Sequence, residues 1–262
     1  MTKQVKASPK PEGEKSEQKN KKLPSRQQVA DEPNYGTLPH ILDVLDRLNE
    51  AHRYDESPAD LYATGEPLDG LLLTLLSQNT NDRNRDMAYE KLRSAYSTWR
   101  KVACLPVGEI ASLIKSAGLG DTKAARMKDI LQKIRLDFGD YSLKKMFDWS
   151  QSDVREYLSA LPGIGPKTVA CVMVFDLDMP AFPVDTHVAR LSKRFGWAGE
   201  KTPPEKIQLF LEEIVPVERC RGGHLNMIEH GRRVCHARKP ACDLCNASDL
   251  CKFHRENHDR PE

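Results

Sequence analysis

The sequence contains no apolar run long enough to cross a membrane. Its most apolar stretch, Leu71 to Leu76, is interrupted by Thr74 and falls far short of the roughly 20 residues that a spanning helix needs. The first ten residues also lack the apolar core of a secretory signal peptide. We therefore expect no membrane partner and a cytoplasmic protein.

The chain carries little net charge, formally +2 over 262 residues, so any basic surface must be local. One local excess lies between Met1 and Ala30, with eight Lys or Arg against three Glu. Residues 1–36 have very few large aliphatic side chains and cannot offset the entropy lost on folding, so we expect a disordered tail. Weak, salt-sensitive DNA attraction and a tail without a specific role both remain open.

No stretch alternates apolar and polar residues as a half-buried strand does. From Leu38 onward, apolar residues instead recur every three or four positions, which indicates amphipathic helices and an all-α fold. After the first helix, which begins near Leu38, the expected helices span 68–78, 83–96, 108–116, 123–138, 152–161, 167–177, 186–195, 204–214 and 223–234. The segment 70–78, GLLLTLLSQ, is apolar nearly all round, which predicts a helix buried on most sides.

The stretch 161–168, LPGIGPKT, predicts a very tight turn between two helices. Gly163 and Gly165 permit the positive φ that such a turn needs, and they let backbone N–H groups approach a ligand closely. Amides at the start of the second helix would attract a phosphate, which is a sequence-independent hold on DNA. Ile164 would pack back and hold the two helices together. A purely structural corner between helices fits the same pattern.

Lys167 favours a functional reading of this turn. An ammonium in the first turn of a helix faces the positive end of the helix dipole, and burial would destabilise its charge further. Such a lysine is suited to act as a neutral amine that forms an imine with the C1′ carbon of a sugar. A lysine that only contacts phosphate remains the alternative.

Asp185 follows eighteen residues after Lys167, in the segment 183–187, PVDTH. A helical pattern comes directly after it, so we expect Asp185 to cap that helix. A carboxylate facing a sugar would also stabilise the oxocarbenium-like transition state of glycosidic cleavage. One residue can serve both purposes.

Four of the seven cysteines gather near the end of the chain. Cys235, Cys242, Cys245 and Cys251 are separated by six, two and five residues. Clustered thiols indicate a metal site more than a disulfide frame, and on spacing alone both one zinc ion and an iron–sulfur cubane remain open.

The hairpin LPGIGPKT, the segment VDTH and the cysteine pattern together resemble the helix-hairpin-helix DNA glycosylases, most closely the endonuclease III family, over roughly residues 38–253. The resemblance implies that Lys167 is the nucleophile and Asp185 its essential partner. Relatives that only excise a base carry other residue types, such as Ser or Tyr, at the lysine position. It also implies that the four cysteines hold a [4Fe-4S] cluster with a structural role.

The same resemblance implies the residues that contact DNA. The family places a polar wedge in a loop resembling LLSQNTND and an apolar wedge in a loop resembling GLGDTK, and the matching residues are Asn79 and Leu119. Gln78 adjoins Asn79 and could take over its part, and Gly120 and Ser159 depart from the residues common in relatives. The other expected DNA contacts are Gly163, Ile164, Gly165, His187, Arg238 and Lys239. Arg238 and Lys239 lie in a local basic stretch, Val217 to Pro240, with six Lys or Arg and two Glu.

The resemblance implies two helical domains, a six-helix barrel with the hairpin at 66–180 and an iron–sulfur domain built from 37–65 and 181–262. It implies a monomeric, nucleoid-associated base excision repair enzyme acting on double-stranded DNA with a damaged base or an abasic site. Its activity would be removal of oxidised pyrimidines, followed by β-elimination through a lysine imine. The alternatives are a monofunctional adenine or mismatch glycosylase and a non-catalytic DNA-binding or redox-sensing iron–sulfur protein.

Overall fold

The computed structural model describes residues 34–56 and 65–258, and every regular element in these ranges is a helix. The all-α prediction is therefore confirmed. No helix within these ranges is long and apolar enough to cross a membrane. The predicted tail lies outside the described residues as far as residue 33. Tyr35 is described, and its ring packs edge-on against His40 at a centroid distance of 5.3 Å.

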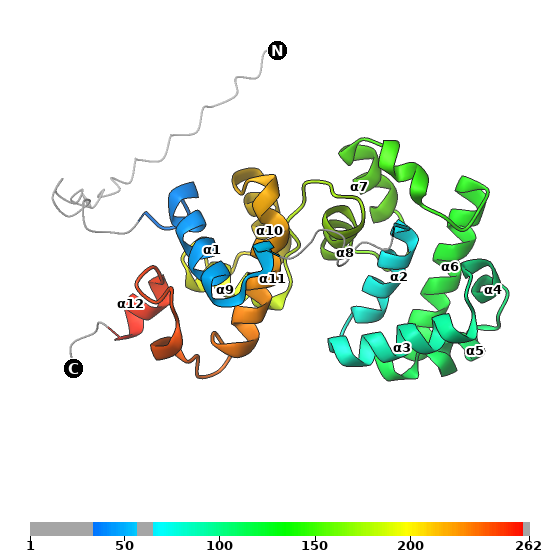
Figure 1. Ribbon diagram of the computed structural model, residues 1–262, viewed down its shortest axis with the longest axis horizontal. Coiled ribbons are helices and arrows are strands. Elements are labelled where there is room, and N and C mark those ends of the chain that lie inside the picture. The colour runs from blue at the N-terminus through cyan, green and yellow to red at the C-terminus, as the bar shows by residue number, and fades with distance from the viewer. Residues whose placement is uncertain (1–33, 57–64, 259–262) are drawn as a thin grey trace, which may run out of the picture. The chain divides into compact units, whose positions relative to one another are not determined.

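The elements follow one another along the chain in the order shown in Figure 1. The α-helices of the described ranges are α1 (Leu38–His52), α2 (Pro67–Ser77), α3 (Asp82–Ala95), α4 (Trp99–Ala103), α5 (Val107–Leu113), α6 (Gly120–Phe138), α7 (Gln151–Ser159), α8 (Pro166–Cys171), α9 (Thr186–Arg194), α10 (Pro204–Ile214), α11 (Val217–Arg233) and α12 (Lys252–His258). The shorter elements are the 3₁₀ turns η1 (Tyr54–Glu56), η3 (Lys115–Ala117), η4 (Lys144–Asp148) and η6 (Cys242–Leu244), and the π-helical segment η5 (Val172–Asp176).

Most helices lie within a few residues of their predicted positions, and three differences stand out. The short helices α4 and α12 were not predicted. Helix α11 begins at Val217, six residues before the expected start, and continues through Gly222 and Gly223. Helix α8 ends at Cys171, where the chain changes to π-helix, with Leu177 N donating to Val172 O at 3.1 Å.

The helices form two sets of contacts that meet at η5. Helix α1 packs against α11, which also contacts α9, and α10 and α12 contact α9. Helix α2 contacts α3, α6 and α8, while α5 packs against α6 and α7 against α8. The segment η5 contacts both α2 and α11. Residues from Asn34 onward form one compact unit, and the division into domains at 66–180 remains a prediction.

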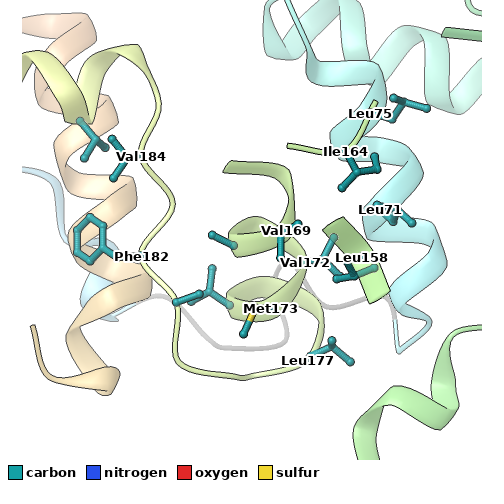
Figure 2. Close-up of a cluster of buried hydrophobic side chains, with 14 of the residues drawn as sticks. Leu71, Leu75, Leu158, Ile164, Val169, Val172, Met173, Leu177, Phe182 and Val184 are labelled. Atoms are coloured by element: carbon teal, nitrogen blue, oxygen red, sulfur yellow. The ribbon is translucent and has the colours of Figure 1, made fainter. Parts of the chain in front are cut away.

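The core lies largely on α2 and on the helices that follow the hairpin. As predicted, α2 is buried nearly all round, with Leu68, Leu71, Leu72, Leu75 and Leu76 all fully buried. Figure 2 shows Leu71 and Leu75 together with the apolar residues of the hairpin and η5. Helix α2, which ends just before Gln78, is thus anchored against the segment that carries Lys167.

Candidate active site and nucleic-acid interface

The hairpin between α7 and α8 is closed by its own backbone and held by one apolar side chain. Ile164 N donates to Leu161 O at 3.2 Å, and Val169 N donates to Gly165 O at 3.0 Å. The Ile164 side chain is 7% exposed and lies toward Leu71 and Leu75 of α2 in Figure 2. Ile164 packs into the core as expected, so only its backbone is available to a ligand.

The two hairpin glycines are required for different reasons. Gly163 has φ +74°, and a Cβ there would lie 2.6 Å from Arg126 Cδ, so both the turn and packing need glycine. Gly165 instead has φ −99°, an extended backbone open to any residue, and a Cβ there would meet nothing within 4 Å. The expectation that both glycines serve a positive φ holds for Gly163 only. Neither the backbone conformation nor internal packing requires a glycine at position 165. The backbone there is exposed and carries no side chain.

Lys167 is half-buried in the first turn of α8, one turn before the buried Cys171. Burial raises the pKa of the Cys171 thiol, and the charge of Lys167 together with a side-chain hydrogen bond to it opposes that shift. The charge of Lys167 therefore acts on a buried thiol one turn further along the same helix.

Asp185 caps α9, as the sequence predicted. Its Oδ1 accepts hydrogen bonds from His187 N and Val188 N, each at 2.8 Å. The residue is half-buried, and these two bonds fix one oxygen of the carboxylate. Among the described residues no hydrogen bond to Oδ2 is present, so that oxygen is available to a substrate.

A buried histidine lies behind both residues. His224 of α11 is 2% exposed, and its Nδ1 donates to Pro183 O at 2.7 Å. Burial lowers the pKa of His224 to about 4, the Asp185 charge opposes that shift and the Lys167 charge adds to it. The charges of Lys167 and Asp185 both act on His224 and on Cys171. Lys167 and Asp185 therefore both lie within electrostatic reach of His224 and Cys171, although they come from separate helices.

His187 lies against α11. A Cβ on Gly231 would come within 2.6 Å of its Nδ1, and that atom lies 3.1 Å from the Arg190 guanidinium. Arg190 also donates to Gly231 O at 3.0 Å and to Cys235 O at 3.1 Å. His187 therefore helps to pack α9 on α11, and its contact with DNA remains a prediction.

The four predicted cysteine ligands line one cavity, with about 350 Å³ of empty space, together with Arg194, His230 and Phe253. All four are free thiols. Burial raises the pKa of Cys245 and of Cys251 to about 11 in each case. Within the described ranges no three His, Cys, Asp or Glu side chains are close enough to hold a single metal ion. The four described thiols therefore share one pocket without forming a site for a single ion.

Arg194 of α9 binds the loop that starts at Cys235 and lines this cavity. Its guanidinium donates to Cys235 Sγ at 3.0 Å, to His236 O at 2.8 Å and to Ala237 O at 3.1 Å. Arg238 and Lys239, the next two residues, are exposed, and Lys239 has φ +49°. The loop therefore presents two basic side chains from a backbone that is fixed on its inner side.

A family model matches the segment that contains the hairpin, the lysine and the capping aspartate. The model for the HhH-GPD superfamily base excision DNA repair protein matches residues 72–217, which contain both Lys167 and Asp185. The chain belongs to this superfamily.

Individual relatives narrow the position within the HhH-GPD superfamily. Endonuclease III of Thermotoga maritima is 33% identical over 190 residues, which are 72% of this chain and 84% of the relative. Endonuclease III of Sulfolobus acidocaldarius is 32% identical over 189 residues, 71% of this chain and 82% of the relative. A solved structure of a trapped endonuclease III–DNA covalent intermediate matches with a TM-score of 0.72 and 26% identity, covering 85% of this chain and 99% of the other. The protein is an endonuclease III-like DNA glycosylase of base excision repair.

The two residues that the family resemblance predicts to enter the DNA, Asn79 and Leu119, are exposed and have a left-handed backbone. Asn79 has φ 54° and Leu119 has φ 51°, and the Leu119 side chain is 60% exposed. The neighbouring Gln78 is half-buried and bonded to the hairpin, since its Nε2 donates to Gly163 O at 3.1 Å. Gly120 begins α6, where a Cβ would lie 3.1 Å from Ala111 O, so a larger residue at this position would require the neighbouring backbone to shift.

Several residues that support the site were not expected from the sequence. Cys171, His224 and Arg194 were not among the predicted site residues. Arg190 and Arg194 stand four residues apart on the helix that Asp185 caps, which places both on one face. That spacing was a usable signal for Arg190 and Arg194. Nothing local marks His224, which meets the site only through the packing of α11.

Proposed function

We propose that this protein is a bifunctional glycosylase and AP lyase that removes oxidised pyrimidines from double-stranded DNA. The observation that carries the proposal is the shared environment of Lys167 and Asp185, whose charges act on the same two buried groups. One of the similar solved structures is a trapped covalent intermediate of endonuclease III with DNA, which supports a covalent step here.

In the proposed reaction, Lys167 Nζ attacks C1′ of the damaged nucleotide while the bond from C1′ to the base breaks and the base leaves with a proton. The amine must be neutral to attack. The bond from C1′ to O4′ then breaks, and O4′ takes up a proton, which opens the sugar ring and gives the protonated imine. Loss of a proton from C2′ of this imine breaks the bond from C3′ to the phosphate oxygen, and this β-elimination cuts the strand.

Asp185 would stabilise the positive charge that develops on the sugar. A carboxylate with one oxygen fixed by two backbone N–H groups is preorganised, so it needs no reorganisation when the charge appears. Its second oxygen would face the sugar and then assist the proton transfers of the lyase step. This role is compatible with the observed helix cap.

The donor set of the cysteine cavity fits a [4Fe-4S] cluster held by Cys235, Cys242, Cys245 and Cys251. In a cubane each thiolate binds a different iron, so the four sulfurs stand further apart than four ligands of one zinc ion. The four thiols line one pocket, and no three of the described side chains are placed to hold a single ion, which supports the larger group. The cluster would fix the loop that carries Arg238 and Lys239, and it would take no part in bond cleavage.

Opening of the duplex would depend on Asn79 and Leu119. Chemistry on a base requires that it leave the stack, and side chains must fill the gap. Both residues are exposed, and residues with a strained backbone occur preferentially at functional sites. The hairpin backbone at Gly163 and Gly165, together with Arg238 and Lys239, would hold the phosphates on either side.

Borohydride trapping tests the proposal directly. Wild-type protein with duplex DNA containing thymine glycol should give a covalent adduct after reduction, and Lys167→Gln should give none while still binding the DNA. Excision without any adduct would instead indicate a monofunctional glycosylase. A normal adduct with Lys167→Gln would show that another amine is the nucleophile.

A further inference from the structure

A buried lysine joins the two loops that carry Asn79 and Leu119. Lys123, in the first turn of α6, is 1% exposed, which is rare for a lysine. Its Nζ donates to Leu76 O at 2.7 Å and to Ala117 O at 2.8 Å. Leu76 lies three residues before Asn79, and Ala117 lies two residues before Leu119. A single ammonium therefore binds the backbone just ahead of both exposed residues.

The chemistry of this contact shows why a lysine is present. Leu76 O is one of the terminal carbonyls of α2 that have no partner within the helix, and a cation is favourable at that end of a helix. Burial lowers the pKa of Lys123, so the ammonium is kept at a cost that the two carbonyl bonds offset. An apolar side chain of similar size would fill the same volume but would leave both carbonyls without their donor.

A second residue of α6 extends the connection to the hairpin. Arg126, one turn after Lys123, donates to Gln78 Oε1 at 3.4 Å, and Gln78 Nε2 donates to Gly163 O at 3.1 Å. The first two turns of α6 thus hold the loop after α2, the loop before α6 and the hairpin. These are three of the segments that the proposed function places on DNA.

We infer that Lys123 is a positioning residue for opening the duplex, because it fixes the spacing between Asn79 and Leu119 so that both enter the DNA as one rigid pair. The inference rests on the proposed function, in which these two residues fill the space left by the flipped nucleotide. Lys123 itself does not touch the substrate. It acts through the left-handed backbone of the two loops, which would otherwise relax independently.

The test compares a lesion in a fully paired duplex with the same lesion opposite a one-nucleotide gap, where the stack is already open. Lys123→Met removes both hydrogen bonds with little change in volume. We expect the single-turnover excision rate on the paired duplex to fall at least tenfold, and the rate on the gapped duplex to change less than twofold. An equal fall on both substrates, or no fall on either, would overturn the inference.

Lys128→Met is the matched control, because Lys128 lies on the same helix and its Nζ also donates to a carbonyl, Leu105 O at 2.5 Å. It should leave the ratio of the two rates unchanged. If Lys123→Met does not fold, Lys123→Gln, which is shorter and uncharged, should show the same selective loss, and an unchanged ratio would contradict the inference. Failure of the proposed function is distinguishable, since the wild type would then show neither excision nor trapping.

Discussion

His224 Nδ1 lies 2.7 Å from the carbonyl oxygen of Pro183, two residues before Asp185. A carbonyl only accepts, so Nδ1 carries the proton, and the neutral ring leaves Nε2 unprotonated. The His224 ring also packs against Phe175 and Phe182, at centroid distances of 5.8 and 6.5 Å. The position of the proposed catalytic carboxylate therefore depends on a side chain of α11 that is itself almost fully buried.

Replacing this histidine should impair excision more than DNA binding. His224→Phe keeps the aromatic packing but leaves the Pro183 carbonyl without its donor, which costs about 1–3 kcal/mol of folding free energy. Because a shift of about 1 Å in a catalytic group can cost roughly 100-fold in rate, we expect the single-turnover excision rate to fall at least about tenfold. DNA affinity, measured by fluorescence anisotropy, should change little.

His40→Phe serves as the control for the histidine prediction. His40 is also buried, and its Nε2 lies 2.9 Å from Leu250 O, so it should cost similar stability. It should leave the excision rate of the folded fraction unchanged. If both variants lost rate equally, His224 would have no special relation to Asp185.

The two hairpin glycines should respond in opposite ways to alanine. Gly165→Ala fits the observed φ and meets no atom, so the free energy of unfolding should stay constant or rise by about 0.4–1 kcal/mol. DNA affinity should nevertheless fall at least tenfold, because the methyl group would stand where the phosphate backbone approaches. Urea unfolding and anisotropy titrations measure the two quantities separately.

Gly163→Ala should instead lose stability, since it forces φ +74° on an alanine and places Cβ 2.6 Å from Arg126 Cδ. We expect a loss of at least about 1 kcal/mol. If Gly165→Ala bound DNA like the wild type, the open backbone at Gly165 would have no role in the grip on phosphate.

Some features of the fold are determined by local signals in the sequence. The cap at Asp185, the buried helix α2 and the start of α10 at Pro204 each follow from a few adjacent residues, and all three predictions are confirmed. The environment of Lys167 was expected only through the chemistry of a first-turn lysine and the family resemblance. Of the groups on which its charge acts, Cys171 lies one turn along the same helix, whereas His224 is brought near by tertiary packing.

The errors have physical causes that the sequence does not display. The predicted helix began at position 223, yet α11 already includes residues 217–222, and both Gly222 and Gly223 lie inside it where η1 and α1 approach. A Cβ on Gly222 would lie 1.7 Å from Asp55 Oδ1, and one on Gly223 would lie 3.3 Å from Leu45. The π-helical segment η5 inserts one residue into a continuous apolar run, and such a run fits either kind of helix. Helix α4 has only five residues, too few to show a period.

Asp176 should make the stability of the protein fall with rising pH. It is buried on η5, and its carboxyl packs against Gly70, where a Cβ would lie 2.0 Å away. Burial and then the charge of Asp69 raise the pKa of Asp176 to about 8, against the opposing charge of Arg221. The folded protein thus keeps a proton that the unfolded chain, with an ordinary value of 3.8, releases.

The stabilisation by this proton is complete below pH 3.8 and is lost as the pH rises through about 8. Each pH unit within that window removes about 1.4 kcal/mol from the free energy of unfolding. Asp176→Asn, which resembles the protonated acid, should flatten this slope and be more stable than the wild type at pH 8. Urea unfolding at pH 6, 7, 8 and 9 measures it, with the exposed Asp178→Asn as control. Equal slopes for Asp176→Asn and the wild type would show that Asp176 ionises normally.

Arg194 should determine how firmly the loop at Cys235 is held. Arg194→Met keeps an unbranched side chain but removes the three hydrogen bonds to the loop, together with the guanidinium that lies 4.8 Å from the centre of the Phe253 ring. Hydrogen bonds from a charged group contribute about 1.5–3 kcal/mol each, so we expect chelators to extract iron at least about tenfold faster. Iron content and visible absorbance over time give the rate.

The DNA affinity of Arg194→Met should fall as well, because Arg238 and Lys239 lose their fixed backbone, and the slope of affinity against salt should decrease. Lys193→Met provides the comparison, since Lys193 is the preceding residue and its Nζ donates to Glu200 O at 2.7 Å, away from the cysteines. It should retain iron like the wild type. Equal retention in both variants would show that the four thiols alone hold the loop and that the arginine is dispensable.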